Sequence, residues 1–101
     1  MLVKLFACMY KVYALVSNTK NWIYVGFSAD LTDRIGRHQL GYEKTTAPYR
    51  PFAVIELACA FNRIEARRLE KWYKTAYGKK AIRLMLFTPF HGGDTSLSAN
   101  R

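Results

Sequence analysis

The stretch that decides the fold is YKVYALVSNTKNWIYVGFS, residues 10–28. It contains two runs rich in β-branched and aromatic residues, 10–17 and 22–28. Runs of this composition are typical of β-strands. The group between them, Asn18-Thr19-Lys20-Asn21, is rich in turn-forming residues. The stretch therefore predicts a β-hairpin.

The length of the turn fixes which residues of the hairpin face each other. A loop over 18–21 pairs residue 17 with residue 22, which places Tyr13 opposite Gly26 and Leu15 opposite Tyr24. Tyr13 and Tyr24 are then diagonal neighbours on one face of the hairpin, about 7 Å apart at Cα. Gly26 leaves space where a backbone or a ligand can approach, although glycine in a strand is also typical of a bulge.

A short helix is expected directly after the hairpin. Asp30 suits the N-cap position and Gly41 suits the end of the helix. Arg34 and His38 are four residues apart and share one face of this helix. A guanidinium can clamp a phosphate and an imidazole can transfer a proton near neutral pH. The same spacing is also typical of a solvated helix face, so the pair alone does not establish a site.

The middle of the chain predicts a loop followed by a strand. Residues 42–51 (YEKTTAPYRP) contain two prolines and two threonines, which indicates an exposed loop that could contact a substrate. Residues 52–60 (FAVIELACA) are interrupted only by Glu56 and are apolar enough for the central strand of a sheet.

Two helices are expected in the remainder. Asn62 and Glu65 resemble a capping box that opens a helix closed by Gly78, with its apolar face in the core. A shorter helix follows over 79–86. The order β-β-α-β-α-α predicts a small α/β (α+β) domain over residues 1–87, with a three-stranded, mostly antiparallel sheet flanked by helices. Residues 88–101 form a polar C-terminal tail.

The composition narrows the class of partner. The 101 residues are enough for one domain, which we expect to be a monomer, with a homodimer as the alternative. Sixteen Lys and Arg against seven Asp and Glu give a net charge of +9, which favours a polyanion such as DNA. An anionic membrane surface and a merely solvated basic surface are the rival explanations.

The cysteines and the N-terminus bear on location. Cys8 and Cys59 lie in apolar runs, which favours buried reduced thiols over a disulfide. Lys4 and Lys11 interrupt the first apolar run, leaving it too short for a signal peptide or a membrane span. We therefore expect a soluble, cytoplasmic protein that begins with a strand and binds no membrane.

Glu70 is a carboxylate in a strongly basic stretch, Arg67-Arg68-Leu69-Glu70-Lys71-Trp72-Tyr73-Lys74. It can form an ion pair with Lys74, four residues later, worth a few tenths of a kcal/mol. It can also hold Mg²⁺, which binds one or two carboxylates together with phosphate oxygens and water. The residues alone leave both readings open.

These residues together resemble a known family. Val12-Tyr13 and Tyr24-Val25-Gly26, with ten residues between the tyrosines, look like the paired motifs of the GIY-YIG endonuclease superfamily. Arg34 follows Tyr24 by ten residues, His38 follows four residues later, and Glu70 lies in a later helix. The resemblance covers residues 9–86. It extends to Arg50-Pro51-Phe52 and Lys74-Thr75-Ala76-Tyr77-Gly78, which are similar to the short, single-domain bacterial members.

The resemblance implies a role for each matching residue. One of Tyr13 and Tyr24 helps to activate the attacking water as a general base. Arg34 holds the scissile phosphate, and His38, found in some branches, assists proton removal. Glu70 holds one divalent metal ion, Mg²⁺ or Mn²⁺, which stabilises the leaving 3′ oxygen. The expected reaction is hydrolysis of a phosphodiester bond.

The chain departs from the family pattern at several positions. Lys11 replaces the motif glycine, and valine replaces isoleucine in both motifs. Ile82 stands where several members have an asparagine, about twelve residues after the metal-binding glutamate. The short members also lack flanking recognition domains, so we expect no sequence specificity.

The sequence therefore predicts a metal-dependent DNA endonuclease that acts on branched or damaged DNA, or without selectivity, in DNA repair or recombination. The alternative is a nucleic-acid-binding module with the same fold and little or no cleavage. Outside the catalytic residues, we expect DNA contacts from Gly26, Arg37, Lys44 and Arg50. Tyr49 either stacks on a base or packs on the domain.

Overall fold

The computed structural model describes residues 8–87, and the elements follow the predicted order. The strands are β1 (Tyr10–Ser17), β2 (Ile23–Ser28) and β3 (Phe52–Ala60). The helices are α1 (Leu31–Gln39), α2 (Arg63–Tyr73) and α3 (Ala76–Phe87), with a short 3-10 helix at Ala47–Tyr49. The predicted α+β class is confirmed. The predicted tail over 88–101 and the expected start of the chain, residues 1–7, lie outside the described residues.

The sheet has the order β2-β1-β3, and both pairings are antiparallel. The hairpin register is the predicted one: Tyr13 pairs with Gly26, and Leu15 pairs with Tyr24. The prediction of a central position for residues 52–60 was wrong, because β1 lies between the other two strands. β1 is almost continuously buried, whereas β3 exposes Glu56, which pairs with Lys11 at the surface.

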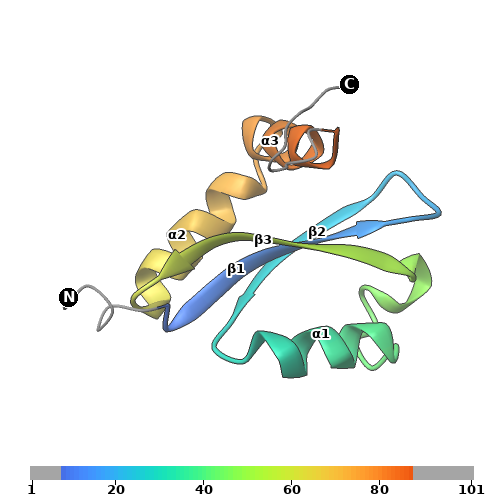
Figure 1. Cartoon of the computed structure of the whole chain (residues 1–101), viewed down its shortest axis with the longest axis horizontal. Coiled ribbons are helices and arrows are strands. Elements are labelled where there is room, and N and C mark those ends of the chain that lie inside the picture. The colour runs from blue at the N-terminus through green and yellow to red at the C-terminus, as the bar shows by residue number, and fades with distance from the viewer. Residues whose placement is uncertain (1–7, 88–101) are drawn as a thin grey trace, which may run out of the picture.

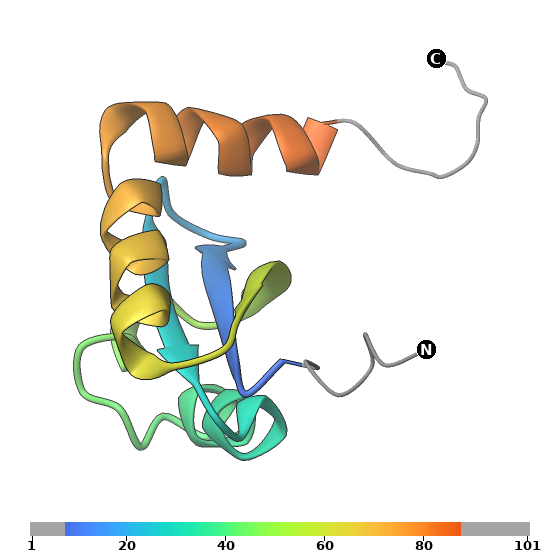
Figure 2. The same cartoon turned by 90° about the vertical axis from the view of Figure 1, so that its left-hand side faces the viewer.

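The helices cover opposite faces of the sheet. Figures 1 and 2 show α1 against one face and α2 with α3 against the other. Because side chains alternate along a strand, β1 supplies both cores. Val12 and Ala14 pack with Ile82 of α3, whereas Tyr13 and Leu15 pack on the side of α1. The chemistry-bearing tyrosines therefore face α1.

The predicted helix starts are correct. The Asp30 carboxylate accepts a hydrogen bond from the Asp33 backbone N–H, and the Asn62 side chain accepts one from Glu65. These bonds satisfy amide groups that the first helical turn leaves unpaired. Gly41 ends the first helical segment with a φ of 82°, a conformation that favours glycine.

The predicted end of the second helix at Gly78 was wrong. α2 ends at Tyr73, and Thr75 starts α3 by accepting a hydrogen bond from the Gly78 N–H on its hydroxyl. A side chain on Gly78 would overlap the backbone of Trp72 and Tyr73. Gly78 is therefore required because the first turn of α3 packs directly on the end of α2, not because it closes a helix.

The expectation that α2 commits its whole apolar face to the core was also wrong. Ala66 is buried and Leu69 packs against the core, but Ile64 is 72% exposed and Trp72 is 48% exposed. Only a narrow stripe of α2 contacts the sheet, so the apolar residues beside that stripe remain at the surface.

Cys8 and Cys59 form a disulfide, which corrects the prediction of two reduced thiols. Cys59 lies near the end of β3, where it pairs with the beginning of β1. The two Cα atoms are 5.0 Å apart, within the range that a disulfide spans. Apolar surroundings indicated burial, but sequence spacing did not indicate that antiparallel pairing brings these two strand ends together.

Within residues 8–87, no helix is both long and apolar enough to span a bilayer.

Candidate functional site

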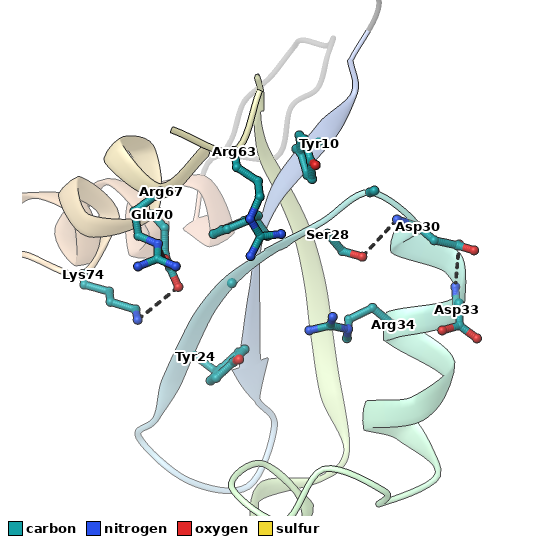
Figure 3. Close-up of a pocket in the computed structure, with 13 residues that line it drawn as sticks. Tyr10, Tyr24, Ser28, Asp30, Asp33, Arg34, Arg63, Arg67, Glu70 and Lys74 are labelled. Atoms are coloured by element: carbon teal, nitrogen blue, oxygen red, sulfur yellow. Dashed lines mark hydrogen bonds and ion pairs between the residues drawn. The ribbon is translucent and has the colours of Figure 1, made fainter. Parts of the chain in front are cut away.

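A groove of about 690 Å³ opens along β2, between α1 and α2 (Figure 3). Three parts of the fold form its walls: the β1–β2 hairpin, the first turn of α1 with the segment before it, and one face of α2. The lining residues are Tyr10, Tyr24, Gly26, Phe27, Ser28, Ala29, Asp30, Asp33, Arg34, Arg63, Arg67, Glu70 and Lys74.

Cations outnumber carboxylates among the side chains that line this groove. Arg34 projects from α1, and Arg63, Arg67 and Lys74 project from α2 on the opposite side (Figure 3). Asp30 and Asp33 line the α1 side as well, and Asp30 caps the helix by accepting from the Asp33 backbone N–H. An arrangement of guanidinium and ammonium groups around an open groove suits a phosphodiester backbone.

Glu70 is the carboxylate that α2 contributes to the groove. Its side chain is 16% exposed and lies 3.1 Å from the Lys74 ammonium and 3.8 Å from the Arg67 guanidinium. The ion pair with Lys74 is therefore real, and it coexists with a position in the groove. The ion pair with Lys74 therefore does not exclude a role for Glu70 as a metal ligand.

The groove offers few groups to a metal ion. Within the described part of the chain, no group of three or more His, Cys, Asp or Glu side chains is arranged to hold one. Mg²⁺ and Mn²⁺ do not require such a set, because Mg²⁺ can take one carboxylate and complete its shell with water and substrate phosphates. Glu70 therefore fits a metal that binds together with the substrate.

The two tyrosines occupy different depths. Tyr24 lines the groove, whereas Tyr13 has no exposed surface and lies behind Gly26. Their ring centroids are 6.3 Å apart, as the predicted diagonal placement requires. Burial, and secondly the nearby Tyr24, raises the pKa of the Tyr13 phenol above its ordinary value, although Arg34 opposes this shift. Tyr13 is therefore a neutral phenol at physiological pH.

The groove places side chains in the pattern expected of a known nuclease family, and the comparison with family models agrees. Residues 9–83 match the model of the GIY-YIG catalytic domain. The chain belongs to the GIY-YIG family. No curated protein and no solved structure matches it significantly. The matched residues, 9–83, include all five predicted catalytic positions.

In this GIY-YIG domain, His38 and Arg34 do not point at one common target. His38 is 1% exposed and lies between Tyr13 and Thr46, with its Nε2 atom 3.1 Å from the Tyr13 hydroxyl. Its Nδ1 atom is 2.8 Å from the Thr46 hydroxyl. Burial lowers the pKa of His38 below its ordinary value, so the imidazole is neutral near pH 7. Arg34 alone of the pair lines the groove.

The basic residues predicted to contact DNA lie elsewhere. Arg37 forms an ion pair with Glu43 at 3.0 Å, which lowers the pKa of that carboxyl. Arg50 donates to the carbonyls of Ala47 and Gln39, and Lys44 is exposed on the same loop. None of the three lines the groove, and their contact with DNA stays a prediction. Gly26, by contrast, does line it.

Tyr49 packs on the domain. Its ring lies on Trp22 with centroids 3.9 Å apart and planes at 6°, and the Lys20 ammonium lies over its ring. One of the two alternatives for Tyr49 is thus seen directly.

Sequence reasoning missed the cations on α2. Arg63 and Arg67 rest over the ring of Phe27, which holds their guanidinium groups beside the strand that carries Tyr24. Residues 63, 67, 70 and 74 recur at intervals of three or four, which places them on one helix face. That spacing was readable in the sequence as a single basic face around Glu70.

Ile82, which replaces the asparagine of several relatives, is fully buried. It packs with Val12, Ala14 and Val25 between α3 and the sheet. The position therefore supports the core of this domain and contributes nothing to the groove.

Proposed function

We propose that this domain is a divalent-metal-dependent endonuclease that hydrolyses DNA phosphodiester bonds in repair or recombination. The observation that carries the proposal is the convergence of Tyr24, Arg34 and Glu70 on one cationic groove from three different elements. More than half of the residues that line the groove are charged, so it suits a DNA backbone better than an individual base. Cleavage is therefore structure-selective or nonspecific.

The residues of the groove divide the work of hydrolysis. The Arg34 guanidinium binds the scissile phosphate and offsets the negative charge that grows on it in the transition state. Glu70 would hold Mg²⁺ or Mn²⁺, and the metal ion would supply charge neutralisation at the leaving 3′ oxygen. Arg67 and Lys74 pair with Glu70, and both would bind neighbouring phosphates when DNA occupies the groove.

Tyr24 is the phenol that a water molecule in the groove can reach, so we assign it the activation of that water. Tyr13 is shielded from solvent and keeps its proton, because burial raises its pKa. It supports the site from behind by contact with Tyr24 and Gly26.

The direct test is cleavage of single-stranded and branched DNA by the purified protein with Mg²⁺ or Mn²⁺. Cleavage should require the metal and should fall by about 100-fold or more in Glu70→Gln, which removes the carboxylate charge. Glu65→Gln is the matched control, because it changes a carboxylate on the same helix that caps the helix start outside the groove. Equal cleavage by wild type and Glu70→Gln would contradict the mechanism.

The alternative is a DNA-binding module that cuts poorly, and one observation favours it. Glu70 is engaged by two cations, and within residues 8–87 no group of three or more His, Cys, Asp or Glu side chains is arranged to hold a metal ion. Salt-dependent DNA binding by the wild type, without metal-stimulated cleavage, would establish this alternative.

A further inference from the structure

Thr46 is a buried polar residue in a loop that the sequence predicted to be exposed. Its side chain has no accessible surface. Its hydroxyl lies 2.8 Å from Nδ1 of His38 and 3.3 Å from the backbone carbonyl of Glu43. Burying a hydroxyl is costly unless it is hydrogen-bonded, so these two contacts account for a threonine at this position.

The hydrogen bond from Thr46 to the Glu43 carbonyl indicates the direction of the hydrogen bonds to His38. The Glu43 carbonyl can only accept, so Thr46 donates to it and its oxygen accepts from Nδ1–H of His38. A neutral imidazole protonated at Nδ1 has a free lone pair on Nε2, which accepts from the Tyr13 hydroxyl.

The donors then run in one direction, from the Tyr13 hydroxyl through His38 and Thr46 to the Glu43 carbonyl. Such aligned bonds polarise and strengthen one another. The Tyr13 hydroxyl at the start of this chain lies beside Gly26, which lines the groove.

We propose that Thr46 is a positioning residue that holds His38 in the Nδ1–H tautomer, and that this chain of hydrogen bonds orients Tyr13, and through it Tyr24, at the groove. Thr46 touches no substrate and acts only through His38. The chemistry it controls is the activation of the attacking water by Tyr24, whose ring lies beside that of Tyr13. The effect on cleavage rests on the proposed nuclease function, whereas the tautomer does not.

The surroundings of His38 agree with a neutral ring. Burial lowers its pKa, as do the charges of Arg34 and Arg37, and Glu43 alone opposes them. Tyr13 and Thr46 face its two nitrogens, and the rings of Tyr24 and Phe52 lie near its faces and edge. His38 therefore serves to transmit orientation, which differs from the proton removal that the family resemblance implied.

The first experiment reads the tautomer directly. The chain contains two histidines, so ¹⁵N-detected imidazole spectra of the labelled protein are simple, and His38→Gln identifies the His38 signals. We expect Nδ1 to show the shift of a protonated nitrogen and Nε2 that of an unprotonated one, near pH 7. A ring protonated at Nε2 instead would overturn the proposal, whether or not the protein cleaves DNA.

The second experiment compares Thr46→Val with Thr46→Ser. Valine keeps the shape and removes both hydrogen bonds, whereas serine keeps the hydroxyl. In Thr46→Val we expect the His38 tautomer to become mixed and the single-turnover cleavage rate to fall by about 10- to 100-fold. Thr46→Ser should restore both readouts to within about threefold of the wild type.

Controls separate the possible failures. Melting curves establish that both variants fold, and the spectra of the wild type test the tautomer even where Thr46→Val is unstable. Equal cleavage rates for folded Thr46→Val and Thr46→Ser would overturn the positioning role. A wild type with the Nδ1–H tautomer but no cleavage under any metal supports the tautomer and refutes the proposed nuclease function.

Discussion

The Tyr13 hydroxyl lies 2.9 Å from the position that a Cβ atom on Gly26 would occupy, and the Tyr24 ring lies 3.0 Å from it. Gly26→Ala should therefore push at least one phenol out of place. Tyr13 is enclosed by the core, so Tyr24 moves more easily, and we expect the cleavage rate to fall by about 100-fold. The measurement is single-turnover cleavage at saturating protein.

Gly36→Ala provides the control for that substitution. Gly36 lies within α1, and a Cβ atom there would meet no other atom within 4 Å. Alanine should stabilise the helix by up to about 1 kcal/mol and leave cleavage unchanged. If both alanine variants cleave like the wild type, the close packing around Gly26 is not needed for activity.

Arg34→Lys keeps the positive charge in the groove but loses the planar pair of N–H donors. We expect DNA affinity to change little and the cleavage rate to fall by about 100- to 1,000-fold, because bidentate stabilisation of the transition state is lost. Arg37→Lys is the matched control on the same helix, since Arg37 pairs with Glu43 outside the groove. A lysine at position 34 that supports normal cleavage would show that charge alone suffices.

The basic face of α2 should dominate the electrostatics of DNA binding. Replacing Arg63 and Arg67 together by Gln should reduce the slope of log affinity against log salt by about 1.4 for single-stranded DNA, or about 0.7 for each phosphate contact. The competing prediction from the sequence concerns Arg37 and Arg50, so the matched double variant replaces those two by Gln. If the Arg37 and Arg50 variant changes the slope and the Arg63 and Arg67 variant does not, the DNA contacts α1 and the loop that follows it instead of the groove.

His38 gives the stability of the domain a pH dependence of known sign. Its pKa is lowered in the folded state from an ordinary value of 6.5, chiefly by burial. The unfolded chain therefore binds a proton more readily, and stability should fall as the pH drops below about 6.5, with little change above it. Glu43 acts in the same direction only at lower pH, because its pKa is lowered from 4.5.

Urea unfolding between about pH 7.5 and about pH 5.5 measures this dependence. The wild type should lose stability over that interval, and His38→Gln should lose less, although it starts from a lower value. Parallel curves for the two proteins would show that His38 is not the group responsible.

Local features of the fold were readable in the sequence. The hairpin register follows from the length of its turn, and the two helix caps follow from side chains that bond within three residues. What escaped prediction depends on contacts between distant segments. The helix break before Gly78 depends on how α3 crosses α2, and the burial of Thr46 depends on His38.

The site divides in the same way. The motif spacing identified Tyr24, Arg34 and Glu70, which do line one groove. It could not show that Tyr13 and His38 lie behind the groove, since Arg34 and His38 share a helix face in any sequence-based projection. The direction of a side chain within that face is decided by the partners it meets, here Tyr13 and Thr46.

The walls of the groove belong to different layers of the domain, because α1 packs on one face of the sheet and α2 on the other. No single supersecondary unit of this chain, whether hairpin, αβ unit or helical pair, contains the whole set of groove residues. DNA cleavage would therefore act as a reporter of cooperative folding: a substitution in either core can silence it from a distance. Alleles that abolish cleavage can be sorted into lesions of the groove and lesions of assembly only when thermal unfolding is measured beside them.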